Sequence, residues 1–461
     1  MTEAHSFHPT VLREYDVRGT YGETLTEADA RALGRAFGTL LRRQGGAHVA
    51  IGRDGRMSSP SLSAALAEGL TAAGCNVTDI GLGPTPMLYF ATWNLPADAG
   101  IMVTGSHNPP DMNGFKMMLS GKPFFGDDIQ SLGRVATAGD FESGDGTVTE
   151  TSIADAYARA VASGYGSDRE FSVVWDCGNG AAGAVINDIV KQLPGRHMLL
   201  FEDVDGTFPN HHPDPTVPKN LTQLSAAVRG IGADLGIAFD GDGDRIGVID
   251  AEGEMLYGDQ ILLLLARDVL KDNPGATIIA DVKASQVLFD GIKAAGGEPL
   301  MFKTGHSLIK AKMAELKSPL AGEMSGHIFF ADRWYGFDDA LYVAVRFLDM
   351  LAGAEQSVTE MRKALPVVLN TPELRFDCDD ERKFDVVREV VARLREKGVA
   401  FSDIDGARVQ NDDGWWLLRA SNTQAVLVAR CEAHSAEGLE RLKAALVEQL
   451  QASGVNPPDD L

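Results

Sequence analysis

The sequence predicts an α/β protein of three related domains in tandem, followed by a smaller α+β domain. Its 461 residues are too many for a single hydrophobic core. A hydrophobic content of 44% with 50 glycines is typical of a globular α/β chain. A third observation is a pattern that occurs three times: an apolar β-rich run, a polar or glycine-rich loop, then an amphipathic helix. This alternation predicts parallel strands joined by crossover helices.

Each occurrence of the pattern places a strand and then a helix. The strands are predicted near residues 48–52, 171–176 and 276–281, and the helices near residues 62–73, 184–190 and 287–292. The remainder predicts a strand-like run from residue 371, a charged helix at 381–397, strands near 415–419 and 425–431, and a last helix at 436–451. We therefore expect four domains, at residues 1–151, 152–255, 256–367 and 368–461.

Composition excludes several classes of function. A formal net charge of −23 disfavours nucleic acid and anionic membrane surfaces as partners. The N-terminus lacks the apolar segment of a secretory signal, and the longest aliphatic run, at residues 261–266, is too short to span a bilayer. The four cysteines are scattered without a CxxC pair, which is typical of reduced thiols. We expect a cytoplasmic protein with no membrane and no nucleic acid as partner.

Three aspartates alternate with glycines in the stretch DGDGDR, where Asp240, Asp242 and Asp244 follow an apolar run. Alternate residues of an extended loop can point the same way, so three carboxylates can converge on one cation. An EF-hand loop is excluded, because its glycine and glutamate positions hold Arg245 and Ala251. The pattern predicts a Mg²⁺ site, and a polar hairpin turn is the alternative.

The stretch CGNGAAG, at residues 177–183, has the spacing GxGxxG between a predicted strand and a predicted helix. Together with Glu202 further along, it resembles a dinucleotide-binding turn. A tight strand-to-helix turn needs glycines whether or not a ligand binds, and we favour that interpretation.

Two later loops place polar groups in apolar surroundings. In GEMSGH, a carboxylate, a hydroxyl and an imidazole can bind sugar hydroxyls, and a plain polar turn is the alternative. In RASNT, the guanidinium fork of Arg419 and the short donors beside it suit a phosphate, and a capped turn is the alternative. The side chains concerned are Glu323, Ser325 and His327 in the first loop and Ser421, Asn422 and Thr423 in the second.

Ser106 stands in TGSHNPP, where a hydroxyl precedes an imidazole and two prolines. A helix cap or a turn explains the serine without any chemistry. Neighbouring side chains in a sequence usually point apart, so we do not expect His107 to be the base that activates Ser106. No GxSxG stretch surrounds the serine, which argues against a hydrolase triad.

In this order, the four loops TGSHNPP, DGDGDR, GEMSGH and RASNT resemble those of the α-D-phosphohexomutase family. The resemblance runs from about residue 12 to residue 432. GEMSGH is similar to the phosphomannomutase/phosphoglucomutase branch, because phosphoglucosamine mutases usually carry Gln where Met324 stands. Supporting stretches are YDVRG from Tyr15, NGFK to Lys116, DVK to Lys283, TGHS around His306 and RWYGFD to Asp338.

The resemblance implies a fold and a reaction. The fold has four domains around a central cleft: three similar α/β domains with mixed sheets and a smaller C-terminal α+β domain. The implied enzyme interconverts hexose 1-phosphate and hexose 6-phosphate, of mannose and/or glucose, through a phosphoserine and a hexose 1,6-bisphosphate. Ser106 would carry the phosphate and join the three aspartates as a Mg²⁺ ligand, and glucose or mannose 1,6-bisphosphate would be the activator.

The resemblance also implies roles for the remaining side chains. Lys116 and His327 would be the general acid and base, Arg245 a fixed cation at the reacting phosphate, and His107 a group that steadies it. Glu323 and Ser325 would bind the 3- and 4-hydroxyls of the sugar. The implied substrate contacts are completed by Tyr15, Arg18, Lys283, His306, His327, Arg419, Ser421, Asn422, Thr423 and Arg430. One departure is Gln424, which stands where a proline is common and is expected to loosen the phosphate loop.

Other functions stay open on the sequence. Phosphoglucosamine mutase is the alternative within the family. A metal-dependent sugar phosphatase and a non-catalytic phosphosugar-binding protein are the alternatives of other classes. The preferred sugar and the oligomeric state, monomer or dimer, are not determined by the sequence.

Overall fold

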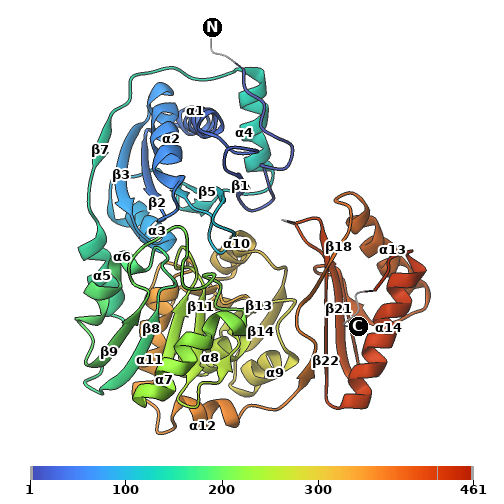
Figure 1. The fold of residues 1–461 in the computed structure, drawn as a ribbon. Helices are drawn as coiled ribbons and strands as arrows, with labels where there is room; N and C mark the ends of the chain where they lie inside the picture. The colour runs from blue at the N-terminus through green and yellow to red at the C-terminus, as the bar shows by residue number, and fades with distance from the viewer. Residues whose placement is uncertain (1–3, 423, 458–460) are drawn as a thin grey trace.

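The structure is a computed structural model that describes residues 4–422, 424–457 and 461. Within these residues the strands form four sheets, one after another along the chain. Figure 1 shows three modules gathered together and the fourth, coloured orange to red, standing to one side of them. No helix in this described part is long and apolar enough to cross a membrane.

The first module is a mixed sheet with helices packed on it. Its strands are β1 (Val17–Thr20), β2 (His48–Arg53), β3 (Asn76–Leu82), β4 (Ala99–Val103), β5 (Met112–Leu119), β6 (Lys122–Pro123) and β7 (Val148–Glu150), and its helices are α1 (Glu27–Arg43), α2 (Ser59–Ala72), α3 (Thr85–Asn94) and α4 (Asp127–Ala138). The strand order is β1-β5-β4-β2-β3-β7, with β6 paired to β5. β2 runs parallel to β3 and β4, whereas β5 runs antiparallel to β4 and β1.

The second module repeats this plan with five strands in the order β12-β11-β10-β8-β9. These strands are β8 (Phe171–Asp176), β9 (Gly195–Leu200), β10 (Leu235–Phe239), β11 (Ile246–Asp250) and β12 (Met255–Leu256), and the helices are α5 (Ala154–Ala162), α6 (Gly183–Val190), the 3₁₀ turn η1 (Pro218–Leu221) and α7 (Thr222–Ile231). β8 is parallel to β9 and β10, and β10 and β11 form an antiparallel hairpin.

The third module has four strands in the order β14-β13-β15-β16. They are β13 (Thr277–Asp281), β14 (Glu298–Phe302), β15 (Leu320–Gly322) and β16 (Ile328–Phe330), and the helices are α8 (Gly258–Asp272), α9 (Gln286–Ala294), α10 (His306–Leu316), α11 (Ala340–Ala352) and α12 (Val358–Lys363). β15 and β16 again form an antiparallel hairpin beside parallel strands.

The fourth module is an antiparallel sheet in the order β17-β22-β21-β20-β19, with β18 also paired to β22. Its elements are β17 (Leu369–Asn370), β18 (Leu374–Asp377), α13 (Arg382–Glu396), β19 (Phe401–Ser402), β20 (Ala407–Asn411), β21 (Gly414–Ala420), β22 (Val426–Ala433) and α14 (Ala436–Ala452). The predicted α/β class, with three mixed sheets and a smaller C-terminal α+β unit, is confirmed.

The four loops singled out in the sequence share one structural position. Each one connects two antiparallel neighbours: β4 to β5, β10 to β11, β15 to β16, and β21 to β22. Sequence periodicity alone predicted parallel sheets and did not show these antiparallel pairs. A short connection between adjacent strands holds a polar segment in a fixed position at the end of the sheet. Each module therefore carries its polar loop on a rigid pair of strands.

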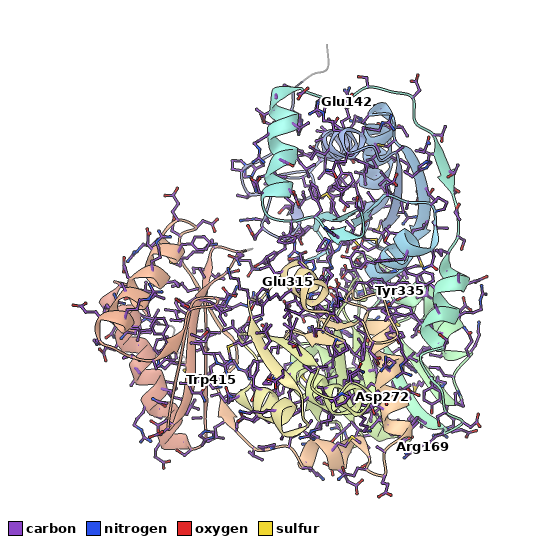
Figure 2. All side chains as sticks on the ribbon, turned by 180° about the vertical axis from the view of Figure 1, so that it is seen from behind. Glu142, Arg169, Asp272, Glu315, Tyr335 and Trp415 are labelled. Carbon is purple, nitrogen blue, oxygen red and sulfur yellow. The ribbon has the colours of Figure 1, made fainter. Side chains whose placement is uncertain are left out.

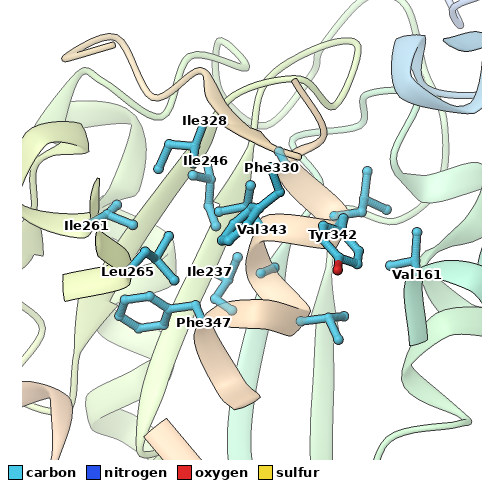
Figure 3. Packing of buried hydrophobic residues seen from close by; sticks show 14 of the residues in the cluster. Val161, Ile237, Ile246, Ile261, Leu265, Ile328, Phe330, Tyr342, Val343 and Phe347 are labelled. Atoms are coloured by element: carbon cyan, nitrogen blue, oxygen red, sulfur yellow. The ribbon is translucent and has the colours of Figure 1, made fainter. Parts of the chain in front are cut away.

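One hydrophobic core joins the second and third modules. Ile237 of β10, Phe330 of β16 and Val343 of α11 are each less than 3% exposed and belong to this cluster (Figure 3). The same cluster includes Met87, Leu88 and Phe90 of α3 in the first module, whose remaining core is separate, and the fourth module has a core of its own. The first three modules therefore share one core, and the fourth lies outside it.

The modules also meet through specific side chains. Arg408 of the fourth module donates to the carbonyls of Val282 and Ala284 at 2.7 and 3.0 Å and lies 3.9 Å above the Trp415 ring. Tyr335 packs its ring against Trp93 of α3, with the ring centroids 5.6 Å apart. Figure 2 shows both labelled rings from behind, Trp415 in the fourth module and Tyr335 near the first.

Candidate active site

The serine loop is held tightly inside its own module. Ser106 is 2% exposed and has φ of +50°, a left-handed conformation that costs a non-glycine residue about 1 kcal/mol or more. The loop is kept in this shape by Thr104, whose hydroxyl accepts the Ser106 N–H at 2.9 Å, and by Arg56, whose guanidinium donates to the Ser106 carbonyl at 2.7 Å. The serine hydroxyl therefore has a fixed place.

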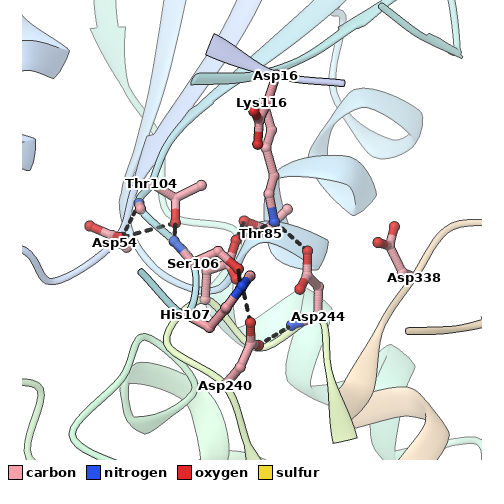
Figure 4. Close-up of polar contacts among 12 residues, drawn as sticks. Asp16, Asp54, Thr85, Thr104, Ser106, His107, Lys116, Asp240, Asp244 and Asp338 are labelled. Atoms are coloured by element: carbon pink, nitrogen blue, oxygen red, sulfur yellow. Dashed lines mark hydrogen bonds and ion pairs between the residues drawn. The ribbon is translucent and has the colours of Figure 1, made fainter. Parts of the chain in front are cut away.

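Two groups contact the Ser106 hydroxyl (Figure 4). It donates to Asp240 Oδ2 at 3.0 Å, and His107 Nδ1 lies 3.1 Å away. The expectation that Ser106 and His107 point apart is wrong, because the left-handed turn at Ser106 brings both side chains to one side. Since the serine hydrogen points to Asp240, His107 Nδ1 is placed as a donor to the oxygen rather than as its base. Burial, reinforced by the positive charge of Arg245, holds the pKa of His107 well below its ordinary value.

The acidic loop wraps its carboxylates inward. Asp240, Asp242 and Asp244 are each 0% exposed. Asp240 Oδ1 accepts the N–H groups of Asp244 and Arg245 at 3.0 and 3.1 Å, which closes the loop on itself. A β-carbon on Gly241 would lie 2.3 Å from the Ser106 carbonyl oxygen, so glycine is required where the two loops cross. The three aspartates predicted as one cluster are brought together.

Lys116 of β5 extends into this cluster from the first module. Its Nζ lies 2.7 Å from Asp242 Oδ2 and 2.5 Å from Asp244 Oδ2. Burial alone disfavours an ammonium, but these two carboxylates raise the pKa of Lys116 well above its ordinary value. Lys116 is therefore a cation in this arrangement, which suits an electrostatic or proton-donating role and not that of a base.

The carboxylates have unused capacity for a divalent cation. Among the described residues, no group donates a hydrogen bond to Asp242 Oδ1 or Asp244 Oδ1, although both atoms are buried. Burial and repulsion by these two neighbours raise the pKa of Asp240 well above its ordinary value. Hard oxygen ligands with excess negative charge are what Mg²⁺ prefers, so the residues present fit that ion.

The second and third modules meet at Arg245 and His327. The two residues form an isolated antiparallel bridge, and Arg245 Nε donates to His327 Nε2 at 3.0 Å. His306 stacks on His327 with ring centroids 5.5 Å apart. Burial and the Lys310 ammonium hold the pKa of His306 well below its ordinary value, so this ring is neutral.

The sugar loop is the stretch GEMSGH at residues 322–327. Its polar side chains are oriented by hydrogen bonds within the loop and from main-chain N–H groups. Glu323 is 4% exposed and accepts the Gly305 N–H at 2.6 Å and the Ser325 hydroxyl at 2.9 Å. The next peptide N–H, of Met324, donates to Asp281 at 2.9 Å. Glu323 and Ser325 thus lie together as predicted.

The phosphate loop is the stretch RASNT that begins at Arg419. Its side chains make hydrogen bonds to residues of other loops. Arg419 Nε donates to Asp405 Oδ2 at 2.9 Å, and Asn422 donates to the Tyr15 hydroxyl of the first module at 2.6 Å. Tyr15 in turn donates to the Thr304 carbonyl at 2.9 Å. Ser421 lies beside them, and its hydroxyl accepts the Gln424 N–H at 3.2 Å. Thr423 lies outside the described residues.

The remaining predicted cations have acidic or main-chain partners. Lys283 Nζ lies 2.9 Å from Glu373 Oε2, and Arg18 Nη2 lies 2.5 Å from Asp16 Oδ2. Arg430 donates to the Lys283 carbonyl at 2.6 Å and is 7% exposed.

Two adjoining cavities make up the cleft. The smaller, of about 120 Å³, is lined by the predicted residues Tyr15, Arg18, His107, Arg245, Lys283, His306, Glu323, Ser325, His327, Arg419, Ser421 and Asn422. The larger, of about 670 Å³, shares part of this wall and includes Arg430. Ser106, Lys116 and the three aspartates line neither cavity, and all five are buried.

Several site residues were missed by sequence reasoning. Arg56 and Asp54 follow β2 in the charged stretch GRDGR, a signal that the sequence did offer at the carboxyl end of a parallel strand. Glu373 and Arg375 line both cavities and form an ion pair of 2.6 Å. Nothing in the sequence distinguishes this pair from other surface charges. Asp338 is the fifth of these missed residues, and it is the last residue of the stretch RWYGFD.

The glycine motif at residues 177–183 is a packing feature. A β-carbon on Gly183 would lie 2.0 Å from the Glu202 carbonyl oxygen, and one on Gly180 would lie 2.9 Å from the Gly241 carbonyl oxygen. The glycines admit neighbouring main chain where a dinucleotide would need space. This observation supports the turn interpretation.

The chain is similar to known proteins over nearly its whole length. Profiles of phosphoglucomutase/phosphomannomutase alpha/beta/alpha domains I, II and III match residues 9–143, 154–253 and 257–368, and the profile of the C-terminal domain matches residues 373–449. A phosphomannomutase/phosphoglucomutase of Pseudomonas putida is 47% identical over 442 residues, covering 96% of this chain and 95% of that protein. A phosphoglucomutase of Neisseria gonorrhoeae is 44% identical over 437 residues, covering 94% and 95%. The crystal structure of a phosphoglucomutase/phosphomannomutase family protein from Burkholderia thailandensis superposes with a TM-score of 0.92 at 44% identity, covering 97% of this chain and 98% of that chain.

Proposed function

Because the chain belongs to the phosphoglucomutase/phosphomannomutase family, we propose that it interconverts the 1- and 6-phosphates of mannose and/or glucose through a phosphoserine. The observation that carries the proposal is the place of Ser106. Its hydroxyl lies 3.0 Å from Asp240, beside a buried ammonium and two further carboxylates. Such a cluster serves phosphoryl transfer, because it positions the reacting oxygen and balances charge during transfer.

The proposed reaction begins with a phosphate on Ser106. A hydroxyl of the bound sugar attacks the phosphorus, and a new O–P bond forms as the bond from Ser106 Oγ to phosphorus breaks. His327 takes the proton of the attacking hydroxyl, and Lys116 gives a proton to the departing serine oxygen. A Mg²⁺ ion held by Asp240, Asp242 and Asp244 would draw charge from the transferring phosphoryl group. Arg245 and His107 stay beside that group as fixed donors.

The sugar bisphosphate then presents its other end to Ser106 for the reverse transfer. The phosphate that is not reacting binds the guanidinium of Arg419 and the short donors Ser421 and Asn422. Glu323 and Ser325 bind the 3- and 4-hydroxyls. Glucose and mannose share those two centres and differ at C2, so one site accepts both. Free glucose 1,6-bisphosphate or mannose 1,6-bisphosphate acts as activator by rephosphorylating Ser106.

A serine substitution tests the proposal. With glucose 1-phosphate, Mg²⁺ and glucose 1,6-bisphosphate, we expect the wild-type chain to form glucose 6-phosphate and Ser106→Ala to lose at least about 10⁴-fold in kcat. Intact-mass measurement should show one phosphate that is absent from the variant. Ser120→Ala is the matched control, because Ser120 also has φ of +50° and lies in an exposed turn away from the cluster. A fully active Ser106→Ala would refute the phosphoserine.

A substrate panel separates the alternatives. Comparable kcat/KM values for mannose and glucose phosphates support the proposal, and a clear preference for glucosamine phosphate would assign the phosphoglucosamine mutase activity instead. Sustained release of free phosphate without isomerised sugar would identify a phosphatase. Binding without turnover or phosphorylation would identify a phosphosugar-binding protein.

A further inference from the structure

A buried polar chain lies behind His327, on the side away from Arg245. Asp338 is 0% exposed, and its Oδ2 lies 3.0 Å from His327 Nδ1. Its other oxygen, Oδ1, accepts from Lys310 Nζ at 2.9 Å. Lys310 in turn lies 3.4 Å from the Tyr89 hydroxyl, and its Nζ is 4.4 Å from the centre of the Tyr89 ring. The chain therefore runs from α3 of the first module to the imidazole of the third.

The contacts of His327 determine which of its nitrogens carries the hydrogen. Arg245 Nε donates to His327 Nε2 at 3.0 Å, and an arginine side chain offers donors but no acceptor. A neutral imidazole has one donor and one acceptor nitrogen, so Nε2 is the acceptor and Nδ1 carries the hydrogen.

The surroundings of Nδ1 leave two candidate acceptors. Asp338 Oδ2 lies at 3.0 Å and Asp244 Oδ1 at 3.5 Å. Neither oxygen accepts a hydrogen bond in the described residues, and His327 Nδ1 has no hydrogen-bond partner there either, so all three buried atoms are open. His306 Nδ1 also faces Asp338 Oδ2, but at 3.8 Å it is beyond hydrogen-bonding distance. Asp338 Oδ2 is thus the carboxylate oxygen nearest to His327 Nδ1, at a distance from which a small rotation of either side chain makes the hydrogen bond.

We propose that Asp338 is a positioning residue that fixes the Nδ1–H tautomer of His327 and leaves the lone pair of Nε2 on the side of Arg245 and the cleft. The inference rests on the proposed function, because it assigns Nε2 as the atom that removes the sugar hydroxyl proton. In that step the hydrogen bond from Arg245 Nε to His327 Nε2 is given up, the hydroxyl O–H bond breaks and the Nε2–H bond forms. Asp338 stays ionised and lies beside the resulting imidazolium.

The charge state of Asp338 is consistent with this role. Burial disfavours its ionised form, but Lys310 and His327 hold the pKa of the carboxyl well below its ordinary value. Lys310 also fixes the orientation of the carboxylate through Oδ1. A carboxylate that is both ionised and held in place is what orients an imidazole in catalytic sites.

The first test reads the tautomer directly. ¹⁵N-histidine NMR of the full chain, with and without Mg²⁺, should show His327 with its hydrogen on Nδ1, and His327→Gln identifies its resonances by their loss. We expect Asp338→Asn to move the hydrogen partly or wholly to Nε2. A wild-type His327 protonated on Nε2, or an unchanged tautomer in Asp338→Asn, would overturn the proposal. The NMR measurement on the wild-type chain does not depend on whether any variant folds.

The second test is kinetic. Asp338→Asn should lower kcat about 10²- to 10⁴-fold, the range for a general base, with KM for glucose 1-phosphate changed by less than about threefold. Asp339→Asn is the matched control, because Asp339 is the adjacent buried carboxylate and contacts Tyr157 and the start of α11 instead. Equal losses in both variants would show a structural role and overturn the proposal. The tautomer is measured without substrate, so an inactive chain with the expected tautomer would refute the proposed function alone.

Discussion

The serine loop and the phosphate loop face the same cleft but are held differently. The main chain of the serine loop is bonded from its own module: Arg56 is 1% exposed and donates to the carbonyls of Ser106, Asn108 and Met112 at 2.7, 2.7 and 2.9 Å. It also bonds the Pro109 carbonyl. The phosphate loop is held by side-chain bonds, of which Arg419 to Asp405 lies within its module and Asn422 to Tyr15 reaches another.

The difference follows from what each loop must do. A reacting oxygen has to keep its place to within a fraction of an ångström, because small misplacements cost large factors in rate. A group that grips each end of the sugar in turn has to release it again, and exchangeable side-chain bonds permit this. Changes at the serine loop should therefore affect kcat, whereas changes at the phosphate loop should affect KM.

Within this comparison of the two loops, the largest effect is expected from Arg56→Lys. A lysine ammonium cannot reach the four carbonyls that the guanidinium holds, so buried carbonyls lose their partners and the strained turn at Ser106 relaxes. We expect kcat to fall about 100-fold with KM nearly unchanged, together with a lower thermal midpoint. Arg53→Lys makes the same change at the end of β2 and should be nearly neutral. A loss confined to KM would contradict the comparison.

An intermediate effect is expected from Arg419→Ala. A charged hydrogen bond to phosphate contributes about 1.5–3 kcal/mol, so KM for glucose 1-phosphate should rise about 10- to 100-fold. kcat should change much less, because the chemistry is at the other loop. Arg441→Ala removes an exposed arginine paired with Asp413 on the same module and serves as the control. If KM stays constant while kcat falls, Arg419 does not bind the phosphate.

The smallest effect is expected from Glu373→Gln. Glu373 pairs with Lys283 at 2.9 Å and with Arg375 at 2.6 Å, so it neutralises two cations that line the cleft. Without it, inorganic phosphate should bind about fivefold more tightly, as measured by calorimetry. Asp377→Asn, at the end of the strand β18 that follows Glu373, makes an equal change in net charge and should leave the affinity unchanged. Weaker phosphate binding would show that Glu373 orients the cations instead of competing with the ligand.

The sequence predicted much of the site, for reasons of chemistry. The aspartates of DGDGDR predicted a cation site from residue type and spacing, whereas RASNT alone left a capped turn open and was identified through the resemblance of all four loops in order. The departure at Gln424 proved informative in the structure: its side chain accepts from Arg375 at 2.8 Å, and its carbonyl accepts from Lys383 at 2.7 Å. The loop is thus bonded on both sides where loosening was expected.

The contacts between distant residues were not predictable in the same way. Ser106 and Asp240 are 134 positions apart, and Lys283 and Glu373 are 90 apart. His107 was misjudged because its orientation depends on a left-handed backbone at Ser106, which Arg56 and Thr104 hold in place. The effect of burial on the pKa of Lys116 likewise depends on which carboxylates the second module places beside it.

By itself, the sequence determined the α/β class, the strand-then-helix pattern of three modules and the residue types that each loop offers, because hydrophobic periodicity and residue type act over a few neighbouring positions. Only the tertiary structure decided which loops meet, which nitrogen of His327 carries its hydrogen, and that Asp338 and Lys310 lie behind it. Those outcomes depend on the packing of separate modules, which sets distances and burial between residues that no local pattern connects.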